Sequence, residues 1–171
     1  MNERKDVVTF KGSPVTLVGA MPAVGDSAPN FIALSTALEQ VEFNAYRGKP
    51  VVLVSVPSLD TSVCDTEVRR FNQEAAGLSK EVRIVTVSMD LPFAQKRWCG
   101  AHGINRVETL SDHRDAAFGR AYGVLIKELR LLARAVFVVD RSHRICYVQL
   151  VKEISKEPDY GAVLKAIAAV A

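Results

Sequence analysis

The sequence has no long hydrophobic run, and this absence excludes a membrane-spanning helix. Its longest apolar stretches, Ala135–Val139 and Ala166–Ala171, fall far short of the ~20 residues that a membrane-spanning helix needs. The first residues, Met1–Asp6, are polar and lack the apolar core of a secretory signal. We therefore expect a cytoplasmic protein that does not contact a membrane.

An excess of charge of one sign is also missing. The 22 basic and 19 acidic residues give a net charge of +3, and they are mixed along the chain instead of forming one stripe. Because nucleic-acid-binding domains carry a concentrated basic surface, the sequence predicts no nucleic-acid partner.

Cysteine is scarce, with three residues, Cys64, Cys99 and Cys146. In a chain without a secretory signal they do not make a disulfide framework, because reducing compartments keep structural thiols open. They lie far apart, and no Cys-x-x-Cys or His-x-x-x-His pair of the kind that binds zinc occurs. We expect no metal site, and any disulfide should be transient and part of the chemistry.

What the chain does have is the composition of one ordinary globular domain. Its 171 residues, 49% of them hydrophobic and 24% charged, are enough to bury a core, and we expect a single domain over residues 1–171. The β-rich segments 7–10 and 15–18 flank a short turn and predict an N-terminal β-hairpin at about 7–18.

Hydrophobic periodicity predicts the remaining elements. Strands are expected at 31–34, 41–43, 51–56, 82–88, 107–110, 135–140 and 145–150, and helices at about 61–78, 92–101, 116–122 and 160–170. This order predicts an α/β thioredoxin-like fold, in which helices flank a mixed central β-sheet that ends in a hairpin.

Cys64 lies where the buried strand 51–56 gives way to a helix. The first turn of a helix presents free backbone N–H groups and the positive end of the helix dipole, so a thiolate there is stabilised. The alternative is an unreactive cysteine that packs as a small hydrophobic side chain. Thr61 is placed to cap the helix and to hydrogen-bond both the sulfur and an incoming oxygen. Pro57 should rigidify the loop and shield the thiolate from water.

The pattern Pro57-x-x-x-Thr61-x-x-Cys64 resembles the active-site signature of the peroxiredoxins. Over nearly the whole chain the likeness is to one subfamily, the bacterial thiol peroxidases, which are atypical two-cysteine peroxiredoxins. It rests also on the stretches Phe10–Thr16, Arg69–Gln73, Asp90–Gln95, Trp98–Gly100, Ala133–Val136 and Glu157–Tyr160. The resemblance implies that Cys64 is the peroxidatic cysteine, that Cys99 is the resolving one, and that Pro57, Thr61 and Arg134 complete the peroxide pocket.

The same resemblance implies an antioxidant activity. The protein is expected to reduce hydrogen peroxide and alkyl hydroperoxides to water or alcohols, through a Cys64 sulfenic acid and an intramolecular Cys64–Cys99 disulfide. It is expected to be recycled by thioredoxin, which thioredoxin reductase and NADPH supply with electrons, to bind no cofactor itself, and to form a homodimer.

Several residues keep an alternative interpretation. Arg134, taken alone, would be a solvated charge at a strand end. Cys99 lies on a different predicted helix from Cys64, so one helix must unwind before the sulfurs meet, and Gly100 and Gly103 favour the second helix. Cys146 is expected to be a packing residue, and His102, His113 and His143 are expected on the surface. The directions in which Asp65 and Glu67 point stay open.

Two other functions compete. The first is a thiol–disulfide oxidoreductase, since thioredoxins share the predicted fold. Against it, Thr61 replaces the first cysteine of a Cys-x-x-Cys motif, and no proline stands between Pro92 and Pro158, where thioredoxins keep a cis-proline beside the active site. The second is a redox sensor that passes its oxidised state to a partner protein.

Overall fold

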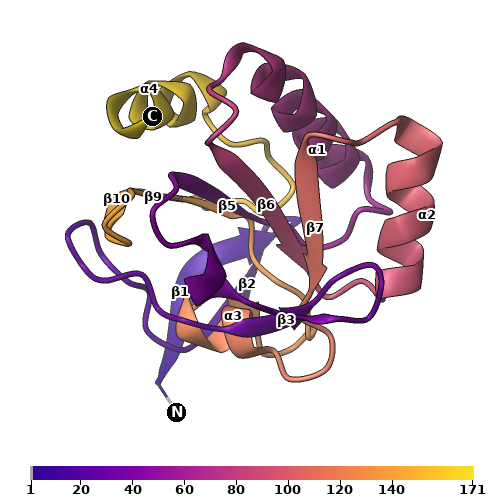
Figure 1. The fold of residues 1–171 in the computed structure, drawn as a ribbon. Helices are drawn as coiled ribbons and strands as arrows, with labels where there is room; N and C mark the ends of the chain where they lie inside the picture. Colours follow the sequence, from indigo (N-terminus) through magenta and orange to yellow (C-terminus); the bar gives the residue numbers. More distant parts are fainter. Residues whose placement is uncertain (1) are drawn as a thin grey trace.

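The computed structural model describes residues 2–171, and its centre is a seven-stranded mixed β-sheet (Figure 1). Met1, with which the predicted domain begins, lies outside the described residues. The strand order across the sheet is β10-β9-β5-β6-β7-β3-β4. The central strands β5 (Val51–Ser55), β6 (Arg83–Ser88) and β7 (Val107–Ser111) are parallel to one another. The outer strands run antiparallel to their neighbours: β9 (Ala135–Val139), β10 (Ile145–Leu150), β3 (Ile32–Leu34) and β4 (Gln40–Glu42).

Strand β5 is hydrophobic almost throughout because both faces of the sheet are covered. Val51 and Leu53 pack into one core cluster, whereas Val52 and Val54 pack into another. Successive side chains of a strand point to opposite faces, so the alternation places one cluster on each side of the sheet. A continuous apolar run is typical of such a doubly covered strand, and the prediction from it is confirmed.

Three helices cover the face that Val52 and Val54 point to. They are α1 (Ser62–Glu74), α2 (Pro92–His102) and α4 (Tyr160–Val170), each of which contributes side chains to that cluster. The opposite cluster lies under α3 (Ala117–Ala121) and a second, three-stranded sheet ordered β1-β2-β8. The described helices thus flank a mixed sheet, as the sequence predicts for a thioredoxin-like fold.

The N-terminal hairpin is confirmed and is longer than predicted. Strands β1 (Glu3–Phe10) and β2 (Ser13–Val18) pair antiparallel. The short strand β8 (Leu125–Ile126), which the sequence does not predict, adds to β2. The 3-10 helices η1 (Phe43–Tyr46) and η2 (Ala75–Gly77) complete the fold, and η2 directly continues α1.

The prediction that His143 lies on the surface is wrong. The turn between β9 and β10 folds back over η1, so the His143 ring packs against Phe43 with 4.6 Å between centroids and is only 2% exposed. Neither ring nitrogen has a hydrogen-bond partner among the described residues. Burial lowers the pKa of His143, and the nearby Arg47 acts in the same direction.

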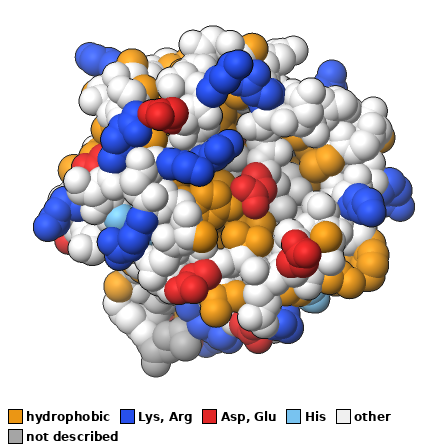
Figure 2. Space-filling model, viewed as in Figure 1, with side chains coloured by type: hydrophobic (Ala, Val, Ile, Leu, Met, Phe, Trp, Pro, Cys, Tyr) orange, Lys and Arg blue, Asp and Glu red, His pale blue; other side chains and the backbone are white. Residues whose placement is uncertain are grey.

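Charges of both signs are spread over the face drawn in Figure 2, with hydrophobic side chains gathered near its centre. Within residues 2–171, none of the helices combines the length and the apolar character needed to cross a membrane. Over the same residues, no group of three or more His, Cys, Asp or Glu side chains is arranged to hold a metal ion.

Candidate active site

Cys64 lies at the start of α1, directly after the loop that leaves β5. Thr61 is the N-cap residue, with extended backbone angles, and its carbonyl accepts the first helical hydrogen bond from Asp65 N at 2.9 Å. Cys64 is therefore within the turn whose N–H groups lack intrahelical acceptors. Its side chain is completely buried, so the sulfur is held away from bulk water.

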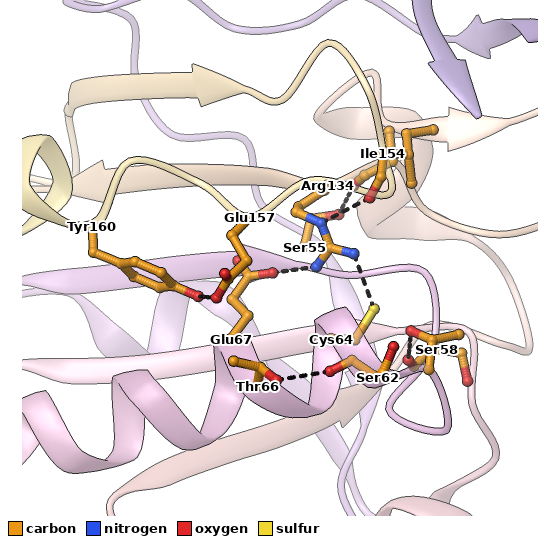
Figure 3. Close-up of polar contacts among 12 residues, drawn as sticks. Ser55, Ser58, Ser62, Cys64, Thr66, Glu67, Arg134, Ile154, Glu157 and Tyr160 are labelled. Carbon is orange, nitrogen blue, oxygen red and sulfur yellow. Dashed lines mark hydrogen bonds and ion pairs between the residues drawn. The ribbon is translucent and has the colours of Figure 1, made fainter. Parts of the chain in front are cut away.

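Arg134 reaches this sulfur because of the sheet topology. Strand β9 runs antiparallel to β5 with Ala135 opposite Ser55, so the residue before β9 lies beside the loop after β5. Arg134 is 1% exposed, which contradicts a solvated strand-end charge. Its Nη2 donates to Cys64 Sγ at 3.3 Å and its Nε donates to Ile154 O at 3.0 Å (Figure 3).

The third donor of Arg134, Nη1, binds Glu67 Oε2, so one guanidinium serves two acidic groups (Figure 3). Burial raises the pKa of Glu67 to about 7, against the opposing attraction of Arg134, and its Oε1 has no hydrogen-bond partner among residues 2–171. Burial by itself would lower the pKa of Arg134, but Glu67 and Cys64 together raise it. The guanidinium therefore stays charged in a closed site.

The two acidic residues after Cys64 point in different directions. Glu67 lies three positions after Cys64, on the inward face that also carries Phe71. Asp65 is one position after Cys64 and points to α2, where it accepts a hydrogen bond from Trp98 Nε1 at 2.9 Å. Helical spacing from Cys64 and Phe71 is thus the signal by which the sequence could have identified Glu67.

The Thr61 hydroxyl makes neither the expected capping bond to α1 nor the expected bond to Cys64 Sγ. Its Oγ1 donates to Ser58 O at 2.8 Å and makes no capping bond to α1. The chain turns back at Ser58–Thr61, which offers the hydroxyl a carbonyl oxygen close by. Thr61 keeps the predicted N-cap position through its backbone, and its side chain is exposed.

Asp90 fixes the loop between β5 and α1, a role that is not among those expected from the sequence. Its carboxylate accepts hydrogen bonds from Ser58 Oγ at 2.6 Å and from Leu59 N at 2.8 Å. Asp90 follows β6, which is parallel to β5, and the ends of parallel strands meet at the same edge of a sheet. The position of Asp90 just after a strand that runs parallel to β5 is therefore the sequence signal that could have identified it. Pro57, at the start of this loop, is buried.

Cys99 lies in the last turn of α2, where its carbonyl accepts hydrogen bonds from the N–H groups of Gly103 and Ile104. Its Sγ is 3.6 Å from Thr109 Oγ1 on β7, and burial raises the pKa of the thiol. Cys64, Cys99 and Cys146 are all free cysteines in this structure. Cys146 is half-buried on β10, with its Sγ 3.5 Å from Asp140 Oδ2.

A cavity of about 360 Å³ lies over the loop that leads to Cys64. Its walls come from that loop, from the first turn of α1 and from α2, and include Leu59, Asp60, Thr61, Asp65, Trp98 and His102. The cavity adjoins the start of the helix that carries the buried sulfur, and both apolar and acidic side chains line it.

Comparison with known proteins gives consistent matches. The family model described as Redoxin matches residues 23–164. The chain is 60% identical over 157 residues to the thiol peroxidase of Oceanobacillus iheyensis, which covers 92% of this chain and 95% of that protein. It is 54% identical over 159 residues to the thiol peroxidase of Bacillus subtilis, which covers 93% and 95%.

Solved structures agree with these matches. A peroxiredoxin-like protein from Aquifex aeolicus, 42% identical, superposes with a TM-score of 0.91 over 98% of both chains. A thiol peroxidase from Chromobacterium violaceum is only 19% identical and shares the fold, with a TM-score of 0.84 over 95% of each chain.

Proposed function

Because the chain belongs to the Redoxin family, as a thiol-dependent peroxidase of the peroxiredoxin type, we propose that Cys64 is the residue that attacks the hydroperoxide. The observation that carries this proposal is the buried contact between Arg134 Nη2 and Cys64 Sγ at 3.3 Å. A guanidinium at that distance favours a thiolate, which is the reactive form of cysteine. Because Cys64 and Arg134 are both buried, water screens little of the attraction between the guanidinium and a negatively charged group at this site.

The first step is a two-electron oxidation of the sulfur. The Cys64 thiolate attacks one peroxide oxygen, so an S–O bond forms as the O–O bond breaks, and Cys64 becomes a sulfenic acid. The leaving alkoxide or hydroxide takes up a proton and departs as an alcohol or water. Arg134 is fixed by Glu67 and Ile154 before the substrate arrives, and its charge stabilises the negative charge that develops on the leaving oxygen.

Thr61 and Pro57 complete the proposed peroxide pocket in different ways. The Thr61 hydroxyl proton is engaged by Ser58 O, so its oxygen is left as an acceptor and is suited to bind the O–H group of a hydroperoxide. Pro57 is buried and offers no N–H group, so it shields the sulfur without competing for the substrate. Hydrogen peroxide and alkyl hydroperoxides both carry the O–O–H group that this pocket recognises.

The second step joins the two cysteines. The Cys99 thiol condenses with the Cys64 sulfenic acid, so an S–S bond forms and water leaves. The Cα atoms of a disulfide lie within about 7 Å of each other. We therefore expect the last turn of α2 to unwind, which breaks the hydrogen bonds that Gly103 and Ile104 donate to Cys99 O.

The third step returns the enzyme to the dithiol. Exchange with a dithiol protein transfers two electrons to the Cys64–Cys99 disulfide and leaves the reductant oxidised. We propose thioredoxin in this role, recycled by thioredoxin reductase and NADPH, and a homodimer in the cytoplasm as the working form. The electrons arrive through thiols, so the cycle needs no cofactor bound to this chain.

The test follows NADPH consumption with thioredoxin, thioredoxin reductase and cumene hydroperoxide. Wild type is compared with Cys64→Ser, Cys99→Ser and Cys146→Ser, the last as a matched control on β10. We expect the first two variants to lose turnover and the third to keep it. Turnover that survives in Cys64→Ser overturns the assignment, and rapid oxidation of wild type with negligible turnover supports a sensor instead.

A further inference from the structure

The last turn of α2 is fastened to α1 by three side chains, Asp65, Trp98 and His102, which we call the helix clip. Asp65 Oδ1 accepts a hydrogen bond from Trp98 Nε1 at 2.9 Å and lies 3.3 Å from His102 Nε2. The rings of Trp98 and His102 are stacked, with 4.9 Å between centroids. The clip borders the cavity above the loop that leads to Cys64.

The contacts of His102 are satisfied only by the charged ring. Its Nδ1 lies 2.9 Å from Trp98 O, and a carbonyl oxygen only accepts, so Nδ1 carries a proton. In the neutral ring the other nitrogen, Nε2, would then present a lone pair to the Asp65 carboxylate. With a second proton at Nε2, the same 3.3 Å contact becomes an ion pair.

The groups that face His102 carry charges of both signs. His102 is the last residue of α2, where the helix dipole attracts a positive charge, and the Trp98 ring faces it. Asp60, from the loop before α1, lines the same cavity and adds a further negative charge. Arg69 of α1 opposes the proton, because its Nη1 lies 3.4 Å from Asp65 Oδ2.

We propose that His102 is a positioning residue for the resolving step, which rests on the role proposed above for Cys99. Protonated His102 holds the last turn of α2 against α1, and Cys99 lies in that turn, three residues before His102. Closure of the Cys64–Cys99 disulfide requires the turn to unwind, so the protonated clip slows it. Loss of the proton at Nε2 leaves only the Trp98 hydrogen bond to Asp65 and releases the turn more readily.

Trp98 provides the means to observe this step, because it is the single tryptophan of the chain and belongs to the clip. Reduced protein is mixed with excess hydrogen peroxide in a stopped-flow instrument, and the fluorescence of Trp98 is followed. The oxidation phase depends on peroxide concentration, whereas the resolving phase, being intramolecular, does not. A Cys99→Ser sample identifies the resolving phase by its loss.

Four proteins are compared across the range of about pH 5 to 8 in which histidine changes charge: wild type, His102→Gln, His102→Arg and His113→Gln. His113, whose Nδ1 lies 2.9 Å from Ser111 Oγ, provides the matched control. The ratio of the His102→Gln to the wild-type resolving rate removes the pH dependence of the Cys99 thiol, which both proteins share.

We expect His102→Gln to resolve about two- to fivefold faster than wild type at the acidic end, as for a partly exposed ion pair, and the ratio to approach one at the alkaline end. His102→Arg should stay slow throughout, and His113→Gln should follow wild type. A ratio that is constant with pH, or an Arg variant that behaves as the Gln variant does, overturns the role of His102. A resolving phase that persists in Cys99→Ser overturns the proposed role of Cys99 instead.

Discussion

Replacement of Arg134 by methionine tests the core of the proposed site. Methionine is an unbranched, uncharged side chain, so Arg134→Met removes the guanidinium and leaves an apolar chain in its place. The change deletes the contact with Cys64 Sγ at 3.3 Å, the bond to Ile154 O at 3.0 Å and the ion pair with Glu67. Only the first of these acts on the reacting sulfur directly.

The expected size of the effect follows from that one contact. A hydrogen bond to a charged group contributes about 1.5–3 kcal/mol, and each 1.36 kcal/mol changes a rate tenfold. Arg134→Met should therefore lower the second-order rate constant for oxidation of Cys64 by about 10- to 150-fold. Arg134→Lys keeps a positive charge but cannot serve Cys64, Glu67 and Ile154 at once, so its rate should fall between those of Arg134→Met and wild type.

Stability has to be measured beside the rate. Without Arg134, Glu67 is a buried carboxyl group with no cation, and it must keep its proton in the folded protein. The variant should thus be more stable near pH 6 than near pH 8, and the rates are best compared at the lower pH, after circular dichroism has shown that the protein is folded.

The assay is the fast, peroxide-dependent phase of tryptophan fluorescence. Arg141→Met is the control, since Arg141 is a largely exposed arginine paired with Glu81 at the surface. A folded Arg134→Met protein whose oxidation rate lies within about threefold of wild type would refute the role given to the guanidinium, because even the weaker estimate requires a loss of about tenfold.

Three further predictions concern neighbouring groups. Burial raises the pKa of Glu67 from 4.5 to about 7, so between these pH values the folded state binds a proton that the unfolded state does not. The protein should therefore lose up to about 3 kcal/mol of stability as the pH rises from 4.5 to 7. Urea unfolding should show this loss in wild type and not in Glu67→Gln. Burial lowers the pKa of His143 below 6.5, so wild type should lose stability as pH falls below that value, and an equal loss in His143→Phe would contradict this. Asp90→Ala removes the acceptor for Ser58 Oγ and Leu59 N, so it should lower the melting temperature and the oxidation rate together, and a reduced rate constant with an unchanged melting temperature would argue against a loop-fixing role.

Most of the fold could be predicted from the sequence because the sheet is covered on both faces. Double coverage makes β5 and β9 nearly pure hydrophobic runs, and helices that pack on one face show apolar residues at regular spacing. Strand β8 was missed because two residues are too few to form a periodic pattern, and its pairing with β2 joins segments far apart in the chain.

The sequence predicts those parts of the candidate site that lie at the ends of strands. Cys64 and Arg134 follow from the resemblance, and the pairing of β5 with β9 explains why they meet. The capping bond expected of the Thr61 hydroxyl and the surface position expected of His143 are wrong because each depends on how a loop folds back, toward Ser58 O in one case and onto Phe43 in the other. The local sequence carries little information about how such a loop folds back onto the rest of the chain.

Gly100 lies in the last turn of α2, directly after Cys99, and it links the stability of this helix to the proposed catalytic cycle. Apart from the two neighbouring residues and the backbone of α2 itself, no atom of residues 2–171 lies within 4 Å of the position a Cβ would occupy there, so alanine would fit and would stabilise the helix by about 0.5–1 kcal/mol. A more stable helix next to Cys99 would also unwind less readily in the proposed resolving step. If α2 unwinds as proposed, Gly100→Ala should therefore give a more stable but slower peroxidase.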